Sequence, residues 1–172
     1  MTVDRHVNFD LVIADDTKRI LPKDDYTYLL GASLFVFDRI NAFVVENLGY
    51  TGLTGELDWY HLIDAGQRSY VNYIRDYIDH ELNTNIADQF DRLLNERNRI
   101  VHGFPVTIGK KENNSQEQVL DTKTKHNDKN PVASDKQHII TREEMQQFIA
   151  DCMNLERQLT HVREQLCDKN KA

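Results

Sequence analysis

Cysteine is scarce in this chain, and its two copies give no reason to expect a disulfide. Cys152 and Cys167 fall in one predicted helix, where fifteen residues of helical rise separate them by about 22 Å. The Cα atoms of a disulfide lie no more than about 7 Å apart. Cys152 belongs to the apolar side of that helix and is interpreted as a core residue.

Features that mark several common function classes are also missing. The sequence contains no Gly-rich phosphate loop, no nucleophile elbow and no paired-cysteine zinc motif. No apolar run approaches the roughly 20 residues that a membrane span needs. Residues 1–10 lack the basic stretch and apolar core of a secretory signal. We therefore expect a cytoplasmic protein with no membrane partner.

The composition fits one globular domain, and we expect residues 1–172 to form it. Of the 172 residues 40% are hydrophobic and 28% charged, which is ordinary for a soluble protein. The formal net charge of −7 argues against a protein that coats nucleic acid, because phosphate affinity comes mainly from Lys and Arg. The charge reverses locally between residues 92 and 111, where Glu96 is the single acid. The basic residues there are Arg92, Arg97, Arg99, Lys110 and Lys111.

Three helical regions are predicted before residue 105. The first, from Asp24 or Asp25 as its cap to about Leu48, is apolar nearly all round, so we expect it to be buried on most sides or in a subunit interface. The second runs from about residue 57 to 82, with a break near Gly66. Its tyrosines at helical spacing are interpreted as core residues, the alternative being an RNA-stacking face. The third runs from Ile86 to the stop at residues 103–105.

The remaining elements are a small sheet and a last helix. Residues 106–108, 118–122 and 138–140 are short β-branched runs, which predict a two- or three-stranded meander within a partly mobile, β-rich insertion at 105–140. Thr141 and Glu144 form a capping box, followed by an apolar seam of three- and four-residue steps. The predicted fold is mainly α, a bundle of four to five helices with a small β-hairpin or meander before the last helix.

Arg97 is out of place on the third helix. It lies seven residues after Phe90 and four before Val101, on a face whose other residues are apolar. A guanidinium stays charged and is rarely buried without a partner. Asn98 and His102, four residues apart, lie at the edge of the same face.

Something must therefore compensate the charge of Arg97. An acid of the first helix, such as Asp38 or Glu46, could do so, and His102 would then simply cap the helix C-terminus. A neighbouring subunit or an anionic ligand would serve equally well. Periodicity alone does not separate these alternatives.

The segment Arg97-Asn98-Arg99-Ile100-Val101-His102 resembles the motif of the HEPN superfamily. In that motif an arginine followed by Asn or Asp precedes a histidine by four to six residues. The family includes toxin–antitoxin, phage-defence (abortive-infection) and CRISPR-associated ribonucleases. Its members are bundles of four or five helices with the motif at the end of the penultimate core helix. The motif covers about ten residues here, and the predicted helix order agrees over most of the chain.

The resemblance implies a metal-independent endoribonuclease that dimerises so that two motifs share one cleft. His102 would then act as general base or acid on the ribose hydroxyl or the leaving oxygen. Arg97 would hold the scissile phosphate, and Asn98 would orient the phosphate or the histidine. Arg99, on the opposite face of the helix, is expected to steer the RNA backbone, and with Lys110 and Lys111 of the basic segment it is a predicted substrate-binding residue. The expected partners are RNA, a second copy and an antitoxin protein, with neither cofactor nor metal.

One departure and two alternatives accompany this hypothesis. Family members paired with a nucleotidyltransferase antitoxin have a modifiable tyrosine two residues after the histidine, and here that residue is Phe104, which has no hydroxyl. The main alternative is a non-catalytic HEPN-like module that binds RNA, a nucleotide or a protein. A metal site at Asp76 and His80 is the other, and it is weak because structural sites take about four ligands.

Overall fold

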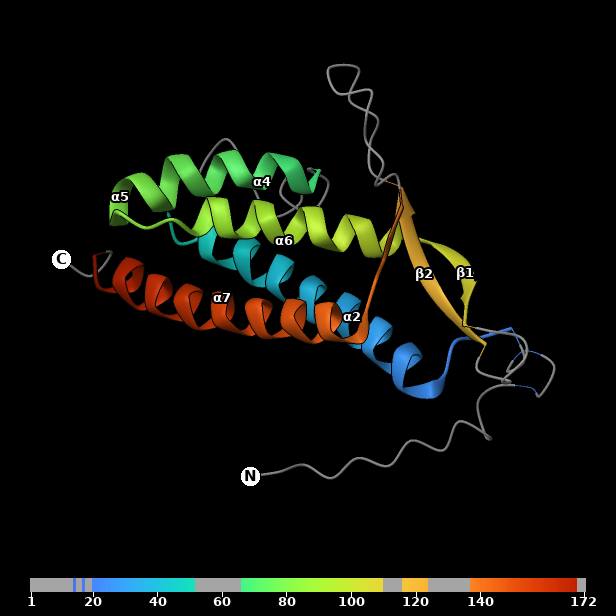
Figure 1. The fold of residues 1–172 in the computed structure, drawn as a ribbon. Helices are drawn as coiled ribbons and strands as arrows, with labels where there is room; N and C mark the ends of the chain where they lie inside the picture. The colour runs from blue at the N-terminus through green and yellow to red at the C-terminus, as the bar shows by residue number, and fades with distance from the viewer. Residues whose placement is uncertain are drawn as a thin grey trace, which may run out of the picture.

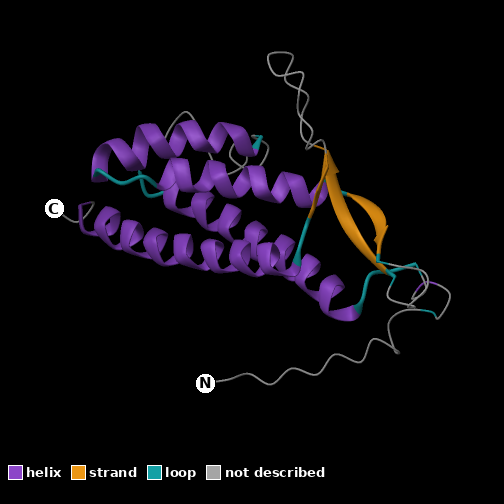
Figure 2. Cartoon of the chain, viewed as in Figure 1, coloured by secondary structure: helices purple, strands orange, loops and turns teal. Residues whose placement is uncertain are grey.

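The computed structural model describes residues 14, 17, 20–51, 66–109, 116–123 and 137–169. Within these residues the chain is mainly helical, with one small three-stranded antiparallel sheet before the last helix, as predicted. The helices pack side by side in a bundle, and the sheet stands at one end of it (Figures 1 and 2). The sheet therefore lies next to the end of the helix that contains the motif.

Helix α2, Asp24–Leu48, begins at the earlier of its two expected cap residues. Lys23 is the N-cap and makes no side-chain capping bond, so the prediction of a cap at Asp24 or Asp25 is wrong. Both aspartates lie in the first turn, where a carboxylate is favoured by the positive end of the helix dipole. The helix ends at Gly49, as predicted.

Only one side of α2 is buried within a single copy of the protein. Phe37, Ile40 and Val44 are fully buried, whereas Phe35 is 73% and Tyr28 54% exposed. The expectation of burial on most sides is therefore wrong for one copy. By length and composition α2 is also the one described helix that could cross a membrane, contrary to the sequence-based expectation, yet its inner side forms the core of the bundle.

The second predicted helix is confirmed from Gln67 onward, and residues 52–65 lie outside the described part of the chain. It consists of α4 (Gln67–Ile74), the π-helical η2 (Arg75–Asp79) and α5 (His80–Leu82), which follow one another without a break. Tyr70 is buried, which confirms the core interpretation for this tyrosine. The helix ends at Asn83, whose φ of 53° is left-handed.

Helix α6, Ile86–Val101, contains the motif and is capped by the helix before it. The two carboxylate oxygens of Asp79 accept hydrogen bonds from the backbone N–H groups of Ile86 (2.8 Å) and Ala87 (2.9 Å). These are free donors of the first helical turn, so the bonds take the place of a side-chain cap from Asn85. The carboxylate fixes where α6 begins and therefore where its residues face.

The sheet follows the predicted runs closely. Strands β1 (Phe104–Ile108), β2 (Glu117–Lys123) and β3 (Gln137–Ile139) pair antiparallel in the order β1-β2-β3. In this register Val106 lies opposite Val119. The meander prediction is thereby confirmed for the described residues of the insertion.

Helix α7, Arg142–Lys169, begins with the predicted capping box. The Glu144 backbone N–H donates to Thr141 Oγ1 (3.2 Å), and the Thr141 N–H donates to Glu144 Oε2 (2.9 Å). The whole predicted seam is buried, which confirms it as a packing surface. It consists of Met145, Phe148, Cys152, Leu155, Leu159, Val162 and Leu166.

Phe37 lies where three helices meet. Its fully buried ring stacks on Phe90 of α6, with centroids 5.8 Å apart, and on Phe148 of α7, at 6.2 Å. The planes of the Phe90 and Phe148 rings are tilted by only 21° and 22° from the plane of Phe37. Offset aromatic pairs of this kind add to the stabilisation from area burial. Phe37 therefore ties α2 to both of its neighbours.

The hydroxyl of Tyr26 joins α2 to the sheet and to the start of α7. It donates to the Ile140 carbonyl oxygen (2.8 Å) and accepts from the Leu120 backbone N–H (3.0 Å). The side chain is fully buried, and the Arg142 guanidinium lies 5.3 Å from the ring centroid. Arg142 also pairs with Asp25 (2.6 Å) and Glu117. This cluster holds the sheet at its end of the bundle.

Removing that hydroxyl should destabilise the fold. Tyr26→Phe leaves the Leu120 N–H and the Ile140 C=O without their partner, and we expect the free energy of unfolding to fall by about 1–3 kcal/mol. Urea denaturation followed by circular dichroism measures the change. Tyr28→Phe is the matched control, because Tyr28 is exposed, and it should change stability by less than about 0.5 kcal/mol. Equal effects of the two substitutions would contradict this account of the sheet.

Candidate functional site

Arg97 lies on the inward face of α6, as its spacing predicted. Its guanidinium carbon is 5.9 Å from the centroid of the Phe37 ring, and the residue is half-buried. Its Nη1 donates to Oδ1 of Asn98 at 3.2 Å. A cation over an aromatic face is attracted by the ring, by about 0.5–2 kcal/mol. This attraction holds the guanidinium in place without neutralising it.

No described acid pairs with Arg97. Glu46 bonds instead to Arg163, with 2.6 Å between Oε2 and Nη2. Asp38 is exposed and forms no ion pair with Arg97. The interpretation in which either residue neutralises Arg97 is therefore wrong for the described chain. The other compensating groups expected from the sequence are a second subunit and an anionic ligand.

The buried Nε of Arg97 also has no hydrogen-bond partner among the described residues. Buried polar groups in proteins are nearly always satisfied. Arg97 thus retains an unused donor within the motif.

His102 stands at the junction between α6 and the sheet. It is the C-cap of α6, its backbone N–H donates to the Asn98 carbonyl oxygen (3.0 Å), and its side chain is exposed. Gly103 follows in a tight space, because an added Cβ would lie 3.2 Å from Cβ of Leu120 and 3.3 Å from the Ile100 oxygen. The close approach of β2 therefore fixes the chain just after the histidine. Arg97, Asn98 and His102 share the last turns of α6.

The three predicted substrate-binding residues fall in two places. Arg99 is exposed and lies beside α7, away from the α2 contact of Arg97, as the helical period predicted. Lys110 and Lys111 lie outside the described residues. Their predicted contribution to RNA binding stays a prediction.

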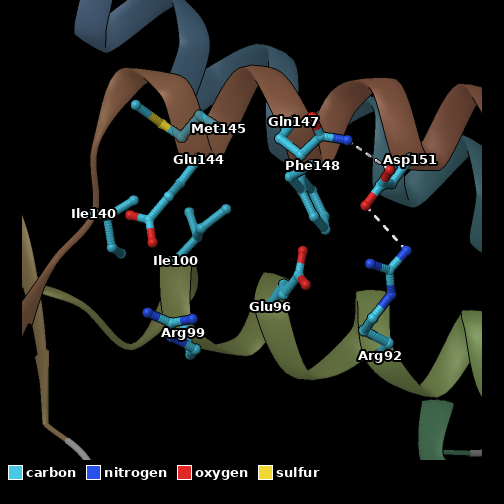
Figure 3. Close-up of a pocket in the computed structure, with 10 residues that line it drawn as sticks. All are labelled: Arg92, Glu96, Arg99, Ile100, Ile140, Glu144, Met145, Gln147, Phe148 and Asp151. Carbon is cyan, nitrogen blue, oxygen red and sulfur yellow. Dashed lines mark hydrogen bonds and ion pairs between the residues drawn. The ribbon is translucent and has the colours of Figure 1, made fainter.

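A pocket that the sequence did not indicate lies between α6 and α7, and Arg99 is one of its lining residues (Figure 3). Its volume is about 180 Å³. Its apolar wall is made of four buried side chains, Ile100, Ile140, Met145 and Phe148. The polar residues around it are Arg92, Glu96, Arg99, Glu144, Gln147 and Asp151. In the sequence, Glu96 differs from its surroundings only as the single acid of the basic segment, which does not by itself predict a pocket.

The carboxylates of this pocket differ in their surroundings. Burial raises the pKa of Glu96 above its ordinary value, against the opposing effect of Arg92. Burial also acts on Glu144, but the Thr141 N–H and the His138 ring hold its pKa below the ordinary value. Asp151 forms an ion pair with Arg92 at 3.0 Å. Glu96 is therefore the carboxylate whose charge the pocket compensates least.

Metal and thiol chemistry find no support in the described residues. No group of three His, Cys, Asp or Glu side chains among them could hold a metal ion, so the Asp76 and His80 pair gains no further ligands there. Burial raises the pKa of Cys152 to about 12, which fits the inert core residue expected from the sequence.

Comparison of this chain with protein-family models, with curated proteins and with solved structures finds no match. The features that point to a function are the geometry of Arg97, Asn98 and His102 and the resemblance of their motif.

The lack of a described acid beside Arg97 predicts an unusual mutant. Arg97→Met keeps much of the side-chain volume and removes a half-buried charge, so we expect the free energy of unfolding to stay equal or to rise by about 1 kcal/mol. Chemical denaturation measures it. The control is Arg157→Met, at an exposed position of α7, which should change stability by less than about 0.5 kcal/mol. A loss of about 3 kcal/mol in Arg97→Met would mean that the guanidinium is structural.

Proposed function

We propose that this chain is a metal-independent endoribonuclease of the HEPN type, in which Arg97, Asn98 and His102 act on RNA. The observation that carries the proposal is the half-buried guanidinium of Arg97, which contacts Phe37 and pairs with no described acid. A phosphate diester supplies the missing anion, and its oxygens match the forked donors of a guanidinium. The adjacent exposed His102 supplies a group that can accept or donate a proton.

The chemistry is an internal transesterification. The 2′-hydroxyl of the RNA attacks the neighbouring phosphorus, and the bond from phosphorus to the 5′-oxygen of the next nucleotide breaks. A neutral His102 imidazole takes the proton of the 2′-hydroxyl, and a protonated imidazole gives one to the leaving oxygen. Arg97 stabilises the charge that develops on the phosphoryl oxygens. The products are a 2′,3′-cyclic phosphate and a 5′-hydroxyl, and the nucleophile comes from the substrate itself.

A homodimer would bring two copies of His102 to one cleft. The exposed side of α2 is the surface that we assign to the subunit interface, because Phe35 and Tyr28 leave it strongly apolar. At 100° per residue, this side lies about 160° around α2 from the side of Phe37, with Leu34 and Asp38 between the two. Gly31 has open space at its Cβ position, so a second backbone can approach there.

The proposal extends to the setting of the reaction. It places the protein in the cytoplasm, in a toxin-like or phage-defence role with an antitoxin protein as a possible regulator. Control by nucleotide transfer to a tyrosine is not part of it, because Phe104 occupies the corresponding position.

Single-stranded RNA should be cleaved in the presence of EDTA. We expect His102→Ala and Arg97→Ala each to reduce the cleavage rate by at least about 100-fold, since each removes a group that acts in the transition state. The matched control is His161→Ala, at an exposed histidine of α7, which should retain the wild-type rate. Gel analysis of labelled RNA, with end-group assignment of the products, measures both.

Undiminished cleavage by His102→Ala would contradict the mechanism. RNA binding without any cleavage by the wild type would favour the competing function, a non-catalytic module that binds RNA.

The interface should be sensitive to charge at Phe35. Phe35→Glu introduces like charges across a two-fold contact, so we expect a monomer in sedimentation at micromolar concentration and a loss of RNA cleavage. Met153→Glu, at a partly exposed position of α7, is the control and should remain dimeric and active. A wild-type protein that sediments only as a monomer while cleaving RNA would overturn this assignment.

A further inference from the structure

Two charged side chains at the pocket between α6 and α7 have no hydrogen-bond or ion-pair partner among the described residues. The carboxylate of Glu96 points toward Phe148 across the space between the helices, and Arg99 lies at the exposed end (Figure 3). The neighbouring charges are already matched, because Arg92 pairs with Asp151 (3.0 Å). Glu144 likewise accepts a bond from the Thr141 N–H (2.9 Å) and lies 2.6 Å from the His138 ring. The pocket thus offers one unused acceptor group and one unused donor group.

The remaining surface of the pocket selects a small planar ligand. Its wall combines the Phe148 ring with three other buried apolar side chains, a surface that fits the flat face of an aromatic ring. A volume of about 180 Å³ leaves room for one small ring system. A half-buried carboxylate against this wall favours a group with two adjacent N–H donors, because both oxygens can then be satisfied.

The pocket is also close to the proposed catalytic histidine. Glu96, Arg99 and His102 follow one another at intervals of three residues on α6. Side chains three apart on a helix are neighbours, with Cβ atoms about 5–6 Å apart. These steps wind about 120° around α6, from the inside of the pocket, past an exposed guanidinium, to the end of the helix. A nucleotide bound along this path would have its base at Glu96 and its phosphate at Arg99.

We infer that the pocket binds a guanine base, with Glu96 accepting its two adjacent N–H donors and Arg99 contacting its phosphate. Guanine is the RNA base whose Watson–Crick edge presents N1–H and N2–H₂ side by side. Adenine and cytosine place a ring-nitrogen acceptor next to their amino group, and uracil has a single donor, so a carboxylate repels part of each edge. For an RNA that follows α6 from this pocket to His102, the enzyme would prefer guanine near the cleaved bond. This last step rests on the proposed function.

The same donor pair occurs in a guanidinium group, for example on a partner protein. RNA is favoured because Arg99, at the exposed end of the pocket, can contact a phosphate and has no hydrogen-bond or ion-pair partner among the described residues. A free guanine nucleotide and a guanine within RNA share the recognition chemistry, and the experiment distinguishes them.

The first arm measures binding of mononucleotides to the full chain by calorimetry. We expect GMP to bind at least 10-fold more tightly than AMP, CMP or UMP, and Glu96→Gln to weaken GMP binding by about 10- to 100-fold. Gln has the size of Glu, and a thermal melt checks that the variant is folded. Glu143→Gln is the matched control, because Glu143 is an exposed acid of α7 outside the pocket, and it should bind GMP as the wild type does. Equal binding of all four nucleotides, or no effect of Glu96→Gln, would overturn the inference.

The second arm measures cleavage of RNA oligonucleotides that contain one guanine among other bases. We expect the wild type to cut next to the guanine, and Glu96→Gln to cut without that preference. Uniform cutting by the wild type would overturn the inference and leave the proposed function intact. No cutting, together with GMP binding that depends on Glu96, would reject the proposed function and assign the pocket to a free guanine nucleotide. Tighter binding of agmatine than of GMP would overturn the guanine assignment in favour of a guanidinium.

Discussion

The stacking of Phe37 on Phe90 and Phe148 is the interaction on which the rest of this structure depends. One fully buried ring of α2 contacts both neighbouring helices and so fixes their separation. The same ring lies under the Arg97 guanidinium. The packing of the bundle and the position of the motif therefore share one residue. The ring attracts the cation but does not neutralise it, and our proposal is that an RNA phosphate supplies the anion.

Helix α6 presents different charged residues to its two neighbouring helices. Toward α2 it presents Arg97 and packs against the core, and toward α7 it forms the pocket with Glu96 and Arg99. His102 follows both at the helix end, where the sheet begins. Polar groups in such positions cost stability, and proteins commonly retain that cost where it serves activity. On this account the unmatched charges of α6 mark the surfaces on which RNA is held.

Much of the fold could be predicted because its signals are local. The Thr141–Glu144 capping box, the β-branched runs and the inward face of Arg97 each follow from spacing over a few residues, and the structure confirms all three. Features that depend on distant residues could not be predicted. Examples are the capping of α6 by Asp79, the pairing of Glu46 with Arg163, and the exposed side of α2. The pocket belongs to the same group, since it exists only where α6 and α7 meet.

The most direct test asks whether RNA supplies the anion that Arg97 lacks. The measurement is the melting temperature with and without an RNA oligonucleotide that has 2′-O-methyl groups throughout and so cannot be cleaved. A ligand that binds the native state raises this temperature by mass action. The account predicts a clear rise for the wild type and for Arg157→Met, and a much smaller one for Arg97→Met. An equal rise in all three proteins would contradict it, because RNA would then bind without the Arg97 guanidinium.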